Sequence, residues 1–183
     1  AAEPAAATIR STDRPETDDR GMSAMRVPAR RMDAFTWTPA GFADAATWDR
    51  SIRDEAARTV RFGRPVTVVM AELHHLDHVA DRLGRDVADR VVTETARLLA
   101  AEGRTADRLA WLGDAKFGVL LLETEESRAR GYVERVRAAT DGWLEWAGLS
   151  IRLSLGWASP AKGGDVIAAA ALAGQRMHDA HRR

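Results

Sequence analysis

Carboxylate and imidazole side chains gather in one short segment, where together they could hold a metal ion. Glu72 is followed closely by His74, His75, Asp77 and His78. His74 and His78 are four residues apart, so within a helix they would share one face, as zinc ligands do. The start of a solvated, polar helix explains the same residues without an ion, and we favour that interpretation. We therefore expect no metal site here.

Composition limits the classes of protein to which this chain of 183 residues can belong. Apolar residues make up 45% and charged residues 30%, which is typical of a globular domain. The formal net charge is zero, so charge gives no reason to expect a nucleic acid or a membrane surface as a partner. Cysteine is absent, which excludes disulfides, thiolate metal sites and cysteine nucleophiles, and fits a cytoplasmic location.

The sequence divides by composition into a tail and one domain. Residues 1–31 include three prolines and few large apolar side chains. Such a segment cannot bury enough surface to offset the entropy lost on ordering. We expect a disordered tail or linker over residues 1–31 and a single domain over residues 32–183.

Apolar periodicity predicts the elements of this domain. Helical spacing predicts helices over about 40–62, 75–83, 86–101 and 125–140, and a last helix after Gly163-Gly164. Short apolar or alternating runs predict strands over 66–71, 109–112, 117–122 and 149–157, with a hairpin at Gly113-Asp114. Trp143 and Trp146 would then lie in a loop. An α+β sandwich satisfies this order, with a central, mainly antiparallel sheet covered by helices on one side.

Five short motifs follow one another along the domain: Asp33-Ala34-Phe35-Thr36, Phe62-Gly63-Arg64-Pro65, Leu83-Gly84-Arg85-Asp86-Val87-Ala88-Asp89, Leu112-Gly113-Asp114-Ala115-Lys116-Phe117 and Ser154-Leu155-Gly156-Trp157-Ala158. In this order and spacing they resemble the GGDEF family, the diguanylate cyclases that make cyclic di-GMP from GTP. The fourth motif falls in the predicted hairpin, where the family carries its signature Gly-Gly-Asp/Glu-Glu-Phe. The resemblance covers about residues 33–181 and implies the nucleotide-cyclase-like sandwich of that family.

The resemblance also implies where metal ions would bind, and these positions depart from the family pattern. Active members join two GTP molecules, one from each subunit of a dimer, with metal ions held by acidic residues. Glu72 matches one of these acids. Ala115 matches the other, and Lys116 matches the acid that follows it in the signature. We expect at most a weak Mg²⁺ affinity at Glu72, because one carboxylate without a partner is a poor site.

The positions that would hold the nucleotide are altered as well. Gly113 keeps the first signature glycine, but Asp114 replaces the second and adds a negative side chain where the phosphates should lie. Of the residues that would recognise guanine, Asp89 remains while Ala80 replaces an asparagine. His181 aligns with the family's phosphate-binding lysine. We therefore predict a degenerate domain and assign no catalytic residue.

A second motif of the family is retained. Arg104-Thr105-Ala106-Asp107 precedes the hairpin at the spacing of the family's inhibitory Arg-x-x-Asp site, which binds cyclic di-GMP. An arginine suits phosphate or guanine acceptors, and a carboxylate suits the donor edge of guanine. In an arginine-rich chain the pattern also arises by chance, and Asp107 can simply start the hairpin strand. Arg130 and Arg137 are candidates for further phosphate contacts or for a solvated helix face.

Three hypotheses about function follow. The favoured one is a catalytically inactive regulatory domain in cyclic di-GMP signalling that binds cyclic di-GMP at Arg104 and Asp107, without a cofactor, as a homodimer or with a protein partner. The first alternative is an interaction or dimerisation module that binds no nucleotide. The second is a residual cyclase, or another GTP-using enzyme, that works through a rearranged site.

Overall fold

The computed structural model of the chain describes residues 39–161 and 164–182. The predicted tail over residues 1–31 and the motif Asp33-Ala34-Phe35-Thr36 lie outside these residues. The elements described follow the predicted order, and their bounds are α1 (Ala45–Phe62), β1 (Val66–His74), α2 (Leu76–Leu83), α3 (Arg85–Glu102), β2 (Arg108–Gly113), β3 (Lys116–Leu122), α4 (Glu126–Trp146), β4 (Arg152–Ala158) and α5 (Val166–His181).

The four strands form one antiparallel sheet in the order β2-β3-β1-β4. β1 is central and longer than predicted, because Glu72 still pairs with Lys116 of β3 and His74 still pairs with Arg152 of β4. The polar side chains at these positions concealed the end of the strand from the apolar pattern. The extension carries the candidate site residues to the end of β1.

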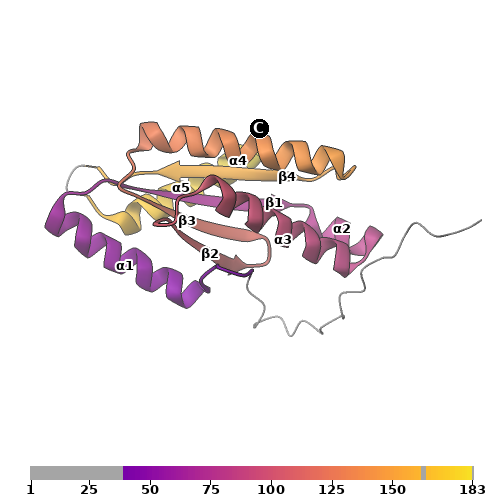
Figure 1. Ribbon diagram of the computed structural model, residues 1–183, viewed down its shortest axis with the longest axis horizontal. Coiled ribbons are helices and arrows are strands. Elements are labelled where there is room, and N and C mark those ends of the chain that lie inside the picture. Colours follow the sequence, from indigo (N-terminus) through magenta and orange to yellow (C-terminus); the bar gives the residue numbers. More distant parts are fainter. Residues whose placement is uncertain (1–38, 162–163, 183) are drawn as a thin grey trace, which may run out of the picture. The chain divides into compact units, whose positions relative to one another are not determined.

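Helices cover both faces of the sheet, so the prediction of helices on one side is wrong (Figure 1). On one face, Val69, Ala71 and Leu73 of β1 share a core with α3 and α4. On the other face, Val66 and Val68 share a core with α1 and α5. Alternate residues of a strand point to opposite faces, so a strand such as β1, in which Val66–Val69 are all buried, requires both layers.

β4 shows why the second layer was missed. Its period of two pointed to one buried face, yet Ser154 and Gly156 are buried along with Leu153 and Leu155. A Cβ atom on Gly156 would lie only 2.2 Å from the carbonyl oxygen of Ala173 in α5. The face that looked polar is instead a face of small residues, against which α5 packs closely.

The helix termini follow ordinary capping rules. The Asp44 carboxylate accepts a hydrogen bond from the Thr47 amide at 2.8 Å, and α1 ends at Gly63, whose φ is 63°. Asp165 caps α5 in the same way, because its carboxylate accepts a hydrogen bond from the Ile167 amide at 2.8 Å.

α4 continues beyond its predicted end at Thr140, so Trp143 and Trp146 lie in a helix and the predicted loop is wrong. Leu144 is buried one turn after Thr140 and continues the apolar face. None of the helices in the described part of the chain is long and apolar enough to span a membrane.

Candidate functional site

The end of β1 carries a charged cluster of Glu72, Lys116 and His178, referred to below as the Glu72 cluster. Lys116 stands opposite Glu72 in the β1–β3 register, with its Nζ 3.7 Å from Glu72 Oε1. His178 of α5 places Nδ1 3.6 Å from Glu72 Oε2. Both carboxylate oxygens therefore face nitrogen atoms that carry, or can carry, positive charge. This arrangement neutralises the carboxylate without a metal ion.

The hairpin tip beside this cluster keeps a tight turn despite its side chains. Gly113 has φ 96° and Asp114 has φ 52°, both in the left-handed region. Aspartate tolerates that region better than most residues, so Asp114 can replace a glycine without changing the turn. Ala115 is buried in the core under α3 and α4, and its carbonyl accepts a hydrogen bond from the Leu73 amide at 3.0 Å. A methyl group thus stands where the resemblance implies a metal-binding acid.

The histidines are arranged differently from the prediction. His74 is the last residue of β1, so it shares no helix face with His78. Its ring stacks on that of His181 with centroids 3.6 Å apart. Burial, and then the neighbouring His181, lower the pKa of His74. The ligand atoms of His75, Asp77 and His78 instead lie within 4.8 Å of one another.

The loop of residues 103–107, referred to below as the Arg104 loop, is held by its own aspartate. Asp107 Oδ2 accepts a hydrogen bond from the Arg104 amide at 2.7 Å, and Oδ1 accepts one from the Leu122 amide at 3.1 Å. The carboxylate therefore ties the end of α3 to β3. The Arg104 side chain is exposed to solvent. The structural role foreseen for Asp107 is present, and the arginine remains at the surface.

Arg130 and Arg137 are exposed on α4 and lie away from this loop, which fits the solvated helix face rather than further phosphate contacts. Arg130 lines a small hollow beside Trp157, and Arg137 lines a groove along β4, which is the opposite edge of the sheet from β2. A different arginine of α4 reaches the loop. Arg135 Nε donates to Glu102 Oε2 at 2.8 Å and Nη2 donates to the Glu102 carbonyl at 3.2 Å.

The sequence held a signal for Arg135 that was not used. Tyr132 lies on the buried face of α4, and its hydroxyl donates a hydrogen bond to the carbonyl of Leu99 in α3 at 2.9 Å. Arg135 lies three residues later and so on the same side of α4. His178 was missed in the same way, since it lies three residues before His181 on α5.

The sequence of residues 40–183 matches the family model described as diguanylate cyclase, GGDEF domain. The chain belongs to the GGDEF family. Two curated relatives are similar over shorter segments. DgcT of Escherichia coli, described as a probable diguanylate cyclase, is 33% identical over 73 residues, or 40% of this chain. The diguanylate cyclase DgcP of Pseudomonas aeruginosa is 30% identical over 110 residues, or 60% of this chain. The match spans only 16% of the length of each relative.

Solved structures of GGDEF proteins share the fold. The coiled coil and GGDEF domain of DgcB from Caulobacter crescentus, solved with cyclic di-GMP, superposes with a TM-score of 0.68 at 17% identity. That match covers 79% of this chain and 81% of DgcB. The diguanylate cyclase SiaD of Pseudomonas aeruginosa, solved with its activator SiaC, gives a TM-score of 0.66 at 25% identity over 77% of this chain and 55% of SiaD. The predicted GGDEF-like α+β sandwich is confirmed.

Asp89, which the resemblance aligns with a guanine-recognition position of the family, lies on α3 and is half-buried. Burial raises the pKa of its carboxyl group above the ordinary value, and the neighbouring Arg85 only partly opposes that effect. The ionised carboxylate is therefore held at some cost to the fold.

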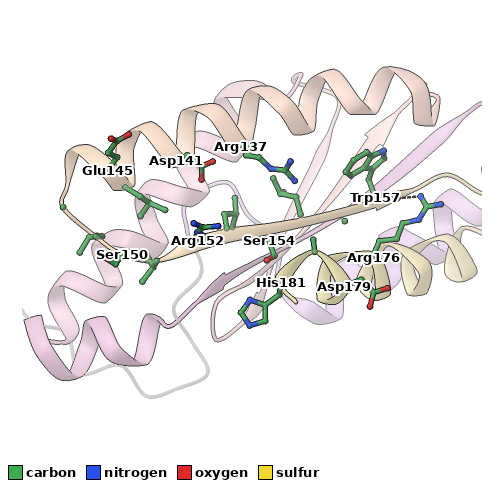
Figure 2. A pocket seen from close by; sticks show the side chains of 18 residues that line it. Arg137, Asp141, Glu145, Ser150, Arg152, Ser154, Trp157, Arg176, Asp179 and His181 are labelled. Atoms are coloured by element: carbon green, nitrogen blue, oxygen red, sulfur yellow. Dashed lines mark hydrogen bonds between the residues drawn. The ribbon is translucent and has the colours of Figure 1, made fainter. Parts of the chain in front are cut away.

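The GGDEF domain also has an open groove along β4, between α4 and α5, with a volume of about 1380 Å³ (Figure 2). Its labelled side chains include both signs of charge on each helix, with Arg137, Asp141 and Glu145 on α4 and Arg176 and Asp179 on α5. Arg176, which lines the groove, donates to the Trp157 carbonyl at 2.5 Å and to Glu126 at 2.6 Å. The sequence did not predict this groove, because it depends on two helices distant along the chain.

Proposed function

We propose that this GGDEF domain is catalytically inactive and acts as a regulatory domain of cyclic di-GMP signalling in the cytoplasm. The observation that carries the proposal is the Glu72 cluster. Ala115 offers no ligand atom, and the Lys116 ammonium group beside Glu72 repels a divalent cation. Loss of one metal-binding acid costs on the order of a thousandfold in rate. Here the second acid is lost and the first is neutralised.

Incubation with GTP and Mg²⁺, followed by chromatography of the nucleotides, tests the inactivity. The active GGEEF domain of a Vibrio cholerae diguanylate cyclase is a suitable positive control, because it shares the fold. We expect cyclic di-GMP from the control and none from this chain. Product that depends on Mg²⁺ would favour the residual-cyclase alternative.

The same domain is proposed to bind cyclic di-GMP at the Arg104 loop, as part of a dimer or with a protein partner. The exposed guanidinium group of Arg104 suits the charged phosphodiesters of the ligand. Arg135 contacts Glu102, only two residues before Arg104, and brings a second guanidinium group to the same end of α3. The crystal structure of DgcB with cyclic di-GMP shows that a protein of this fold takes the ligand.

Calorimetric titration with cyclic di-GMP tests this binding. Arg104→Ala removes the guanidinium group but keeps the backbone amide that donates a hydrogen bond to Asp107, so the loop should stay folded. Arg90→Ala is the matched control, because Arg90 is exposed near the start of α3, about 20 Å from the Arg104 loop at the other end of the helix. Binding that is lost in Arg104→Ala and kept in Arg90→Ala is the expected result. Equal binding by both variants would remove the assignment.

The interaction-module alternative rests on exposed apolar side chains. Trp146 at the end of α4 is 85% exposed, and Val60 and Phe62 are exposed at the end of α1. A titration without heat, together with a sedimentation change caused by Trp146→Ala, would favour this alternative over cyclic di-GMP binding.

A further inference from the structure

The start of α2 brings together three ligand atoms that belong to no family site described above. His75 precedes the helix, and Asp77 and His78 lie in its first turn. One ligand atom from each of the three side chains lies within 4.8 Å of those of the other two. Contrary to the expectation of a merely solvated helix start, we propose that His75, Asp77 and His78 form a site for a divalent ion of the zinc class, separate from the Glu72 cluster.

The geometry needs only side-chain movement to close around an ion. Zinc holds nitrogen and carboxylate oxygen ligands at about 2.0–2.2 Å, so tetrahedral ligand atoms lie about 3.4 Å apart. His78 Nδ1 is already 3.7 Å from Asp77 Oδ1, and the His75 and His78 ring centroids are 5.5 Å apart. All three residues are exposed, so no core packing resists the remaining approach.

The backbone holds His75 in place and leaves its imidazole available. His75 has φ 63°, a left-handed conformation that turns the chain from β1 into α2. It occupies the N-cap position but makes no side-chain capping hydrogen bond. Its ring is therefore not engaged in the role that N-cap side chains usually perform.

The donor set selects the class of ion. Two imidazoles and one carboxylate suit Zn²⁺, Ni²⁺ or Cu²⁺, whereas Mg²⁺ prefers oxygen ligands alone. The negative charge of Asp77 offsets the unfavourable effect of a helix N-terminus on a cation. His181 lies 6.0 Å from His75, centroid to centroid, but its ring stacks on His74. Three protein ligands therefore leave the fourth position to water or to an external ligand.

The distribution of histidine along the chain is a second, independent observation. The chain has five histidines, and all of them lie at the end of β1, the start of α2 or the last turns of α5. A helix start that is only solvated requires polar residues, but these need not be histidines. The concentration of imidazole at one end of the sheet favours transition-metal binding.

Calorimetric titration of the tag-free chain with ZnCl₂ tests the proposal. The test variant is His75→Asn/His78→Gln, in which asparagine tolerates the left-handed φ of His75. The matched control is His178→Gln, which removes one exposed histidine of the neighbouring α5. We expect one ion bound per chain by the wild type and by the control. Since loss of an outer-shell partner alone costs 10–100-fold in metal affinity, the double variant should bind at least about 100-fold more weakly.

Three results would overturn the site. Zinc affinity unchanged in the double variant would show that these side chains are not the ligands. An equal loss of zinc affinity in His178→Gln would indicate that the histidines of α5 bind the ion. The absence of any zinc heat from the wild type would also end the proposal, and circular dichroism of each variant shows that the fold is retained.

Discussion

The Glu72 cluster and the Arg104 loop differ in what has been kept. At the hairpin tip the turn persists, with Gly113 and Asp114 in left-handed conformations, while the side chains that the family uses for metal binding are gone. In the Arg104 loop both family side chains persist, but Asp107 is engaged by two backbone amides. The hairpin tip therefore keeps the backbone conformation of the family without its metal-binding side chains. The Arg104 loop keeps the family side chains, but Asp107 also stabilises the loop.

This difference shows that a motif is interpreted best through its hydrogen-bond partners. Asp107 in the sequence looks like half of a ligand site, whereas its contacts make it a brace between α3 and β3. Glu72 looks like a surviving metal ligand, whereas its contacts make it one member of an ion-pair cluster. The predictions below separate these roles.

The largest effect is expected where α5 packs against the sheet. In Gly156→Ala the new methyl group would meet backbone atoms of Ala173 and Met177 at 2.2 Å, and these cannot rotate away. Such overpacking should cost about 3 kcal/mol in the free energy of unfolding, measured by urea denaturation. Because α5 carries His178, the Glu72 cluster should be disturbed while cyclic di-GMP binding by the folded variant persists.

Gly174→Ala is the matched control, because a Cβ atom at this position of α5 meets nothing within 4 Å. It should stabilise the helix by about 0.5–1 kcal/mol. A Gly156→Ala variant as stable as the wild type would contradict the close packing of α5 on β4.

The second effect concerns the brace in the Arg104 loop. Asp107→Ala leaves the amides of Arg104 and Leu122 without their acceptor, which should cost about 1–3 kcal/mol in the free energy of unfolding. Asp107→Asn keeps one acceptor oxygen and should lose less. Guanidinium unfolding curves measure both. If Asp107→Ala unfolds at the wild-type midpoint, the carboxylate is free for a ligand and the comparison above fails.

A smaller effect is expected in the Glu72 cluster. The Glu72–Lys116 pair is partly exposed and 3.7 Å apart, so its coupling should be below about 1 kcal/mol and weaken with salt. A double-mutant cycle of Glu72→Gln and Lys116→Met, followed by thermal unfolding, measures it. Coupling well above that value would mean that the cluster stabilises the fold and is more than a remnant of a metal site.

The smallest effect concerns Asp89 and pH. Its pKa is raised by burial, so the folded state holds the proton more tightly than the unfolded state. Stability must then fall as pH rises through the carboxyl pKa, and the ionised group destabilises the fold at neutral pH. Asp89→Asn should raise the melting temperature slightly at pH 7, and the gain should vanish near pH 3. A gain that does not depend on pH would assign it to another cause.

The elements were predictable because apolar periodicity is local. The second helical layer was not predictable, because Ser154 and Gly156 look like a solvated face in the sequence and are covered by α5 only in the folded structure. The true end of α4 was missed because Gly142 and the tryptophans resemble a loop, although Leu144 continues the buried face.

The candidate site was predictable in its residues but not in its contacts. The family motifs identified Glu72, Lys116, Arg104 and Asp107 from the sequence alone. The partners of these residues come from elements distant along the chain, as when the Leu122 amide reaches Asp107. The separation of His74 from His78 depended on where β1 ends, and the sequence placed that end three residues too early.

Amide chemical shifts of the ¹⁵N-labelled chain, recorded with cyclic di-GMP and separately with GTP and Mg²⁺, test the central claim most directly. Cyclic di-GMP should shift the amide signals of Arg104 and Leu122, which donate hydrogen bonds to the Asp107 carboxylate. GTP with Mg²⁺ should leave the amide signals of Leu73, Asp114 and Lys116 unchanged. Shifts centred on the hairpin tip with GTP, and none in the Arg104 loop with cyclic di-GMP, would contradict the account.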